Sequence, residues 1–327
     1  MPNPNEPFAE TIIENKPEIT VPASAFFLDI DENDLVAIID KRRDDSVSFY
    51  KDKLKLDERR KINHDFWVGK HMDESALYNW QAPYRDNLIW QDTETRIAIV
   101  SSRMPDFVVT PPNPDKREAA KALEKGLDIK IRTDVTKRLI KNGLRDNHLD
   151  FIGIVKCRWD KSRGKNGDYI FERVRPGRLV LDHTSSIPED GFTADNMEYV
   201  VEYIEEPVGV VLAKFPAKKE ELMKKLGIIR GTTKQMAARM RYEEIWFTWY
   251  QKDGEPIECV AWKYDKLILD KTKNPYYDWE GYEKADETGK IDTFYHNHFD
   301  RPRKPYIFFS HMTLGITPMD DTTPVEQ

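Results

Sequence analysis

The amino-terminal half of the chain repeats apolar residues at the three- and four-residue intervals that are typical of helices. This spacing predicts one or two helices over residues 31–67. A further helix is expected to begin at Asn87, a good N-cap, and to end at Pro105. One longer helix is predicted over residues 116–142, with Gly143 as its C-terminal cap. Its apolar stripe consists of Leu123, Leu127, Ile131, Val135 and Leu139.

From Phe151 onwards the pattern changes to the alternation that is typical of strands. Pro207 and Pro216 are each expected to start a short helical piece between strands. Asp253-Gly254 is the strongest hairpin signal of the chain, and it predicts an antiparallel meander. These features together predict an α+β fold. The expected strands cover residues 106–110, 152–159, 169–173, 179–182, 197–204, 242–251, 257–263, 267–270 and 305–309.

Two segments lack periodicity. Residues 1–25 carry five prolines, and we expect them to form a flexible amino-terminal arm. Residues 271–300 are rich in Tyr, Asp, Glu, Lys and Asn and predict a long exposed loop. We therefore divide the chain into the arm (1–25), a helical part (26–115), an α+β part (116–320) and the start of another helix (321–327).

The composition suits a protein with much exposed surface or many polar contacts. Only 39% of the 327 residues are hydrophobic, against about 45–50% in an average domain. A net charge of −7 speaks against a duplex binder that relies on Lys and Arg to neutralise phosphates. Residues 116–145 are an exception, with ten basic and four acidic residues. With only Cys157 and Cys259, no signal peptide and no apolar run of membrane-spanning length, we expect a soluble protein from a reducing compartment.

No pattern in the sequence predicts catalysis, and we expect no enzymatic activity, metal or cofactor. Asp29, Asp31 and Asn33 resemble the start of a calcium loop, but Asp34 stands where that loop needs glycine. We interpret these acids as residues that begin a helix. The adjacent residues 296–298, His-Asn-His, cannot imitate a metal-dependent nuclease, whose residues are widely separated. The chain also has no glycine-rich phosphate loop and no Gly-x-Ser-x-Gly motif.

Three motifs, in this order, resemble tailed-bacteriophage portal proteins of the podovirus-like type. The first is the helix led by Asn87, which exits through Met104, Pro105, Asp106 and residues 108–111. The second is the strand pair 152–159 and 169–174, followed by Arg-Pro-Gly-Arg-Leu-Val-Leu-Asp at 175–182. The third is Pro-Tyr-Ile-Phe-Phe at 305–309, followed by Gly315, Pro318, Asp321, Thr322, Pro324, Glu326 and Gln327. The likeness spans residues 66–327.

This resemblance implies the wing of a portal protein, without its stem, clip and crown. The wing would belong to a dodecameric ring at one capsid vertex of the virion, assembled in the host cytoplasm. Its implied partners are terminase, the major capsid protein, head-completion and tail adaptor proteins, and double-stranded DNA that passes through non-specifically. The gene beyond Gln327 is expected to encode a long stem helix. The channel-facing stem would start at Pro324, Val325, Glu326 and Gln327.

The basic stretch 116–145 and the predicted loop 271–300 are our candidates for the surface between ring subunits. Solvation of the basic residues by water is the simpler alternative. Two other functions stay open, a subunit of a nucleic-acid-processing enzyme and a generic virion adaptor module. Metal-dependent cleavage of DNA would identify the first of these, and a monomer or dimer the second. The basic interface candidates are Lys121, Lys125, Arg132, Lys137 and Lys141.

Overall fold

A computed structural model of the chain describes residues 30–70, 78, 80, 86–102, 108–111, 117–160, 167–185, 194–228, 231–250, 256–285, 291–294 and 301–310. Several predicted features lie outside these residues. They include the arm 1–25, the turn at Asp253-Gly254, the triplet 296–298 and the helix start 321–327, which contains Pro324, Val325, Glu326 and Gln327.

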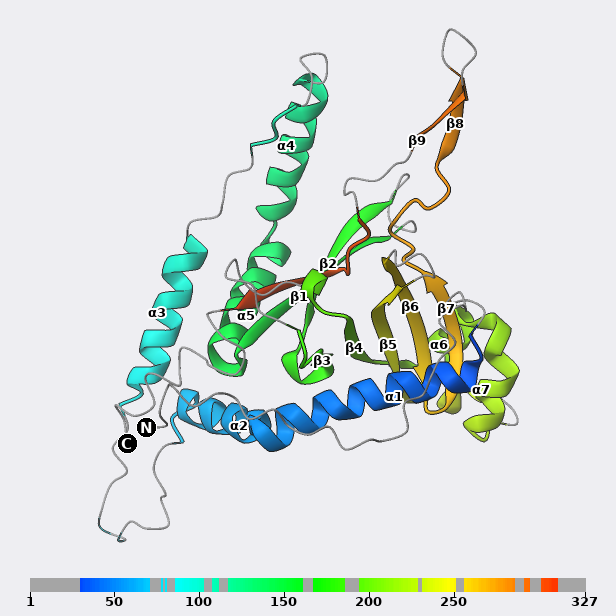
Figure 1. The fold of residues 1–327 in the computed structure, drawn as a ribbon. Coiled ribbons are helices and arrows are strands. Elements are labelled where there is room, and N and C mark those ends of the chain that lie inside the picture. The colour runs from blue at the N-terminus through cyan, green and yellow to red at the C-terminus, as the bar shows by residue number, and fades with distance from the viewer. Residues whose placement is uncertain are drawn as a thin grey trace, which may run out of the picture.

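The fold combines helices with antiparallel sheets, as the predicted α+β class requires (Figure 1). The helices are α1 (Glu32–Ser48), α2 (Leu56–Trp67), α3 (Leu88–Ser102), α4 (Arg117–Ile131), α5 (Asp134–Asp150), α6 (Val208–Lys214), α7 (Lys219–Lys225) and α8 (Thr233–Ala237). The strands are β1 (Ile152–Asp160), β2 (Asp168–Val174), β3 (Leu179–Leu181), β4 (Tyr199–Pro207), β5 (Arg239–Tyr250), β6 (Pro256–Tyr264), β7 (Leu267–Lys273), β8 (Tyr282–Ala285), β9 (Ile291–Phe294) and β10 (Tyr306–Ser310).

The strands form two sheets and a separate hairpin. The larger sheet has the order β3-β4-β5-β6-β7, so the predicted meander β5-β6-β7 is confirmed. The smaller sheet has the order β10-β1-β2, in which Ile154 of β1 pairs with Phe308 of β10 and with Val174 of β2. Strands β8 and β9 pair with each other. The last described strand therefore returns to a sheet that begins about halfway along the chain.

The larger sheet has a covered face on each side, because apolar side chains from alternate positions of its strands point to opposite faces. On one face, Leu35 and Ile39 of α1 pack with Ile245 and Phe247 of β5. Figure 1 shows α1 running across the strands of this sheet. On the other face, Trp246 packs with residues of the smaller sheet, among them Ile152, Ile154 and Tyr306. The two sheets and α1 thus form stacked layers.

Buried ion pairs also join these layers. The Lys156 ammonium of β1 lies 2.7 Å from Glu202 Oε2 of β4 and 2.6 Å from Glu244 Oε1 of β5. Lys263 of β6 pairs with Asp40 of α1 and with Glu243. A third pair joins Lys304 to Glu258 at 2.9 Å, and the Lys304 side chain is fully buried. The periodicity of the sequence assigns lysines to wet positions, so these pairs were not predicted.

The prediction of a single helix over residues 116–142 is wrong. The chain forms two helices, α4 and α5, which are separated at Arg132 and Thr133. The Thr133 hydroxyl accepts a hydrogen bond from the backbone N–H of Thr136 at 3.4 Å and donates one to the Lys130 carbonyl at 2.8 Å. Gly143 is not a C-terminal cap. It lies inside α5, whose C-cap is Phe151.

Replacing Thr133 with alanine is expected to lower the free energy of unfolding by about 1 kcal/mol, because the first turn of α5 loses its side-chain cap. Thr133→Ser keeps the hydroxyl and should stay within about 0.5 kcal/mol of the parent chain. Urea unfolding followed by circular dichroism measures both values. Equal stability of the alanine and serine variants would show that the cap contributes nothing.

The exposed loop expected over residues 271–300 is also corrected. Strand β7 continues to Lys273, and β8 pairs with β9 over Tyr282–Ala285 and Ile291–Phe294. Strands β8 and β9 pair with no other described strand. Their sequence therefore does not need the alternation of apolar and polar residues that faces a core. The strand expected over residues 106–110 is also wrong for the residues that the structure describes, because residues 108–110 do not form a strand.

Candidate functional site

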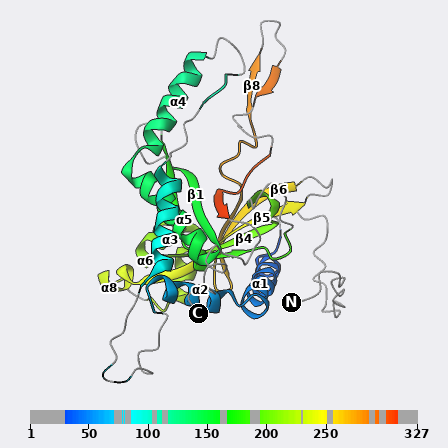
Figure 2. The same cartoon turned by 90° about the vertical axis from the view of Figure 1, so that its left-hand side faces the viewer.

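Helix α4 stands clear of the body of the molecule (Figures 1 and 2). Of its residues only Ala120 is buried, whereas Leu123 is 51% exposed and Ile129 is 62% exposed. Isolated helices shorter than about 12–15 residues are marginal in water, and helices in proteins gain most of their stability from packing. The described residues of α4 thus leave apolar side chains in contact with water.

The basic residues predicted as an interface do not form one cluster. Lys121 and Lys125 lie exposed on α4, and Lys137 is exposed on α5. Arg132, at the break between the two helices, forms an ion pair with Asp128 at 2.5 Å. Lys141 lies 4.0 Å from Glu94 of α3. Two of the five side chains are therefore engaged within the chain, and the remaining three are the better candidates for a partner.

Arg117 extends the exposed cations of α4. Residues 117, 121 and 125 follow each other at intervals of four, which places them on one side of the helix. Arg117, Lys121 and Lys125 have no ion pair within the described part of the chain, unlike Lys130, which pairs with Asp168 of β2. Arg117 lies in the predicted basic stretch but was not among the five interface candidates. Its spacing from Lys121 and Lys125 is the signal that could have identified it.

The base of this helical projection is held firmly. Arg145 of α5 donates two hydrogen bonds to Glu94 of α3, at 2.8 and 3.0 Å, and also lies over the ring of Trp67. The Arg145 hydrogen bond holds the pKa of the Glu94 carboxyl below its usual value. Asn87 caps α3 as predicted, since its Oδ1 accepts from the Trp90 N–H at 2.9 Å. Helices α3 and α5 are thus clamped together, and α4 extends from a rigid support.

One group of side chains resembles a nucleophile with a base. Ser46 Oγ lies 2.8 Å from His183 Nδ1 and 2.5 Å from the hydroxyl of Tyr199. However, Ser46 is fully buried, and the neighbouring Asp182 accepts hydrogen bonds from the backbone N–H of Thr184 and of Glu198 rather than from the histidine. This group therefore joins α1 to the end of β3 and offers no substrate access.

A cleft of about 260 Å³ lies where the α1–α2 junction faces both sheets. Its walls include Phe151, Ile154 and Leu181, and Arg60 lies at its edge. The Arg60 guanidinium sits over the Phe151 ring at 5.0 Å, 4.0 Å from the Asp150 carboxylate. Burial lowers the pKa of Arg60 below its ordinary value. The cleft is lined mainly by apolar residues but also by Lys51, Asp57 and Arg241, and Asp57 forms an ion pair with Arg60 at 3.4 Å.

The remaining chemical candidates are accounted for by local structure. Asp31 is the N-cap of α1, as predicted, and accepts from the Asn33 N–H at 2.9 Å. Cys157 and Cys259 are both free, and burial raises the pKa of Cys259 to about 12. Within the described ranges, His, Cys, Asp and Glu form no group of three that could hold a metal ion. No helix of those ranges is long and apolar enough to cross a membrane.

The chain matches no family model, and no curated protein matches it.

Proposed function

We propose that this chain is the wing of a portal protein, a subunit that forms a ring for the passage of viral DNA. The observation that carries the proposal is α4, which extends from a rigid body with one buried residue and with both cations and apolar side chains in water. In a ring, each subunit meets its neighbours through two different surfaces. A projecting helix whose described residues are mostly exposed is the kind of element that such a contact would cover.

The buried ion pairs of the body suit a ring that must resist mechanical force. Three buried lysines tie α1 and the two sheets together through short ion pairs. A net charge of −7 fits a channel subunit, because DNA that is repelled by the wall can slide whereas a basic channel would hold it. In this proposal the chain performs no covalent chemistry.

The order of elements also supports the proposal. The strand pair β1–β2 is followed by a 3₁₀ turn at Pro176–Arg178 and by β3, which contains the Leu-Val-Leu run of the resemblance. Strand β10, from the third motif, lies beside β1. Residues 324–327 would then begin the channel-facing stem. Terminase, the capsid protein and head-completion proteins would bind the ring at a capsid vertex of the virion.

Purified chain is expected to assemble into ring-shaped particles of one size, in line with the dodecamer that the family resemblance implies. Negative-stain electron microscopy and mass photometry measure the shape and the subunit number. A monomer or dimer at the highest soluble concentration would contradict the proposal and favour an adaptor module. Metal-dependent cleavage of DNA by the same preparation would contradict it in favour of a nuclease subunit.

A further inference from the structure

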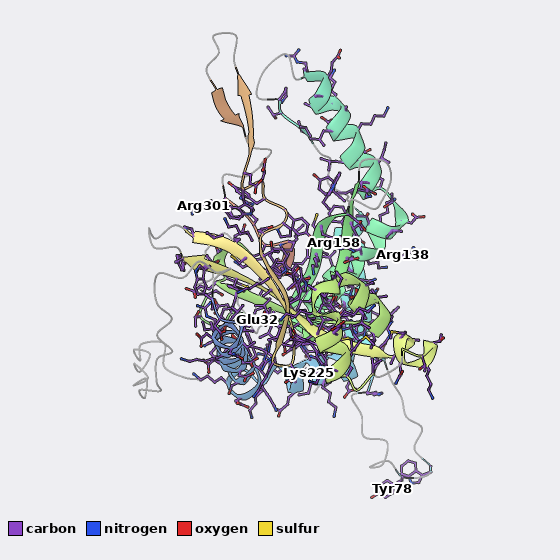
Figure 3. The ribbon with its side chains drawn as sticks, turned by 90° about the vertical axis from the view of Figure 1, so that its right-hand side faces the viewer. Glu32, Tyr78, Arg138, Arg158, Lys225 and Arg301 are labelled. Carbon is purple, nitrogen blue, oxygen red and sulfur yellow. The ribbon has the colours of Figure 1, made fainter. Side chains whose placement is uncertain are left out.

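Two elements of opposite charge project from the same end of the molecule. One is α4 with the start of α5, where residues 117–141 include eight basic and four acidic residues. The other is the region of the β8–β9 hairpin, where the described residues 278–285 and 291–292 include four acidic residues and one basic residue. Figures 1 and 3 show α4 and the hairpin standing apart from each other, beyond opposite sides of the sheets. The two charges do not neutralise each other within one subunit.

Three cations of α4 have no carboxylate partner among the described residues, unlike other cations of this region. Arg117, Lys121 and Lys125 are exposed and have no ion pair with any residue that the structure describes. Like charges four residues apart destabilise a helix by about 0.2–0.5 kcal/mol per pair. A partner that brings carboxylates to this side of α4 would reverse that effect.

An apolar residue beside these cations indicates what kind of partner this is. Ile129, one turn beyond Lys125, is 62% exposed, whereas Leu123, 51% exposed, lies on the opposite side of the helix. A phosphate backbone is bound through charge and polar groups and offers little to an exposed leucine or isoleucine. Protein interfaces combine apolar contacts with a charged rim. The surface of α4 therefore fits a protein with acidic and apolar groups better than it fits DNA.

The β8–β9 hairpin matches this description. It has two strands of four residues each, Tyr282–Ala285 and Ile291–Phe294. An isolated two-stranded hairpin is marginally stable in water and needs further packing. Its sequence includes Tyr282, Ile291 and Phe294 together with an excess of acidic residues. The hairpin thus contains the acidic and apolar residues that would complement α4, and it belongs to the same chain.

We infer that α4 of one subunit docks against the β8–β9 hairpin of the next copy of this chain. The inference rests on the proposed ring, and it names the two surfaces that the ring would use. A contact between two different surfaces of identical subunits repeats around a closed ring. Because one surface is basic and the other acidic, each subunit offers both halves of the contact.

Charge reversal tests this docking. Lys121→Glu with Lys125→Glu, or Glu280→Lys with Glu283→Lys, is expected to weaken the association between subunits roughly tenfold or more. A chain that carries all four substitutions restores opposite charges and should assemble within about threefold of the parent chain. Sedimentation velocity measures the ring fraction, and circular dichroism checks that each variant is folded. Lys41→Glu with Lys61→Glu is the matched control, because it makes the same change of net charge at exposed positions of α1 and α2.

The outcomes separate the inference from the proposed function. If the parent chain forms rings and the reversal on α4 leaves them unchanged, the docking is wrong and the ring proposal stands. If the parent chain forms no rings, the proposed function fails first. If the α4 reversal removes binding of duplex DNA and leaves rings intact, this helix contacts phosphates, and the docking is overturned. Weakening by each pair, rescue by the combination and no effect of the control support it.

Discussion

Lys156→Met is expected to lower the free energy of unfolding by about 3–5 kcal/mol, because it leaves buried carboxylates without their cation. The Lys156 side chain is 7% exposed, and its ammonium bridges Glu202 and Glu244 of the other sheet. Tyr306 also donates to Glu202, and Trp246 donates to Glu244. Neutral donors of this kind cannot replace a full positive charge. Urea unfolding at pH 7 measures the loss.

The same variant should respond to pH in the opposite sense from the parent chain. Burial alone would raise the pKa of Glu244, but the Lys156 ammonium and the indole N–H groups of Trp246 and Trp262 hold it below its usual value. In the parent chain this carboxylate therefore contributes stability above a pH of about 4.3, which is lost as the pH falls further. In Lys156→Met, burial raises that pKa, so protonation stabilises the fold. The stability gap between the two chains should narrow from pH 7 to about pH 5.

Arg158→Met is the matched control, because it removes a cation from the same strand at a partly exposed position. Arg158 lies 3.0 Å from Glu172, and both side chains are in contact with water. Exposed pairs contribute about 0–1 kcal/mol, so this variant should lose no more than that. If Lys156→Met loses as little as Arg158→Met, the buried pairs do not hold the two sheets together.

Local signals allowed much of the fold to be predicted from the sequence. Asn87 and Asp31 cap the helices that they were expected to begin, since capping depends only on residues two or three positions away. Strand alternation identified the meander of β5, β6 and β7. The pairing of β10 with β1 could not be predicted, because it joins segments about 150 residues apart whose register no local pattern encodes.

The candidate surface was predicted less well, and α5 shows why. Its buried residues are mostly polar or small, among them Thr136, Gly143, Asp146 and Asn147. A search for apolar stripes instead follows Val135, which is 64% exposed. Asp146 is buried because it pairs with Arg173 of β2. Apolar periodicity therefore carried one predicted helix through the break at Thr133, and the five basic interface candidates are divided among α4, the break and α5.

Gly153→Ala is expected to destabilise the chain by about 3 kcal/mol or more, because α5 crosses β1 in direct backbone contact. A Cβ atom on Gly153 would lie 1.9 Å from the carbonyl oxygen of Gly143. No side-chain rotation can relieve a contact with backbone, so α5 must move away from the sheet that supports the projecting α4. Urea unfolding at pH 7 measures the loss.

Alanine substitutions at two other glycines allow the expected costs to be ranked. A Cβ on Gly143 would lie 3.0 Å from the ring of Phe309, a side chain that can shift, so Gly143→Ala should cost less than Gly153→Ala. Gly126 of α4 has no atom within 4 Å of the added Cβ, and alanine there should stabilise the helix by up to about 1 kcal/mol. The expected order of stability is Gly126→Ala, parent chain, Gly143→Ala, Gly153→Ala. A Gly153→Ala chain as stable as the parent would mean that α5 does not cross β1 at this point, and that the support of α4 has to be placed elsewhere.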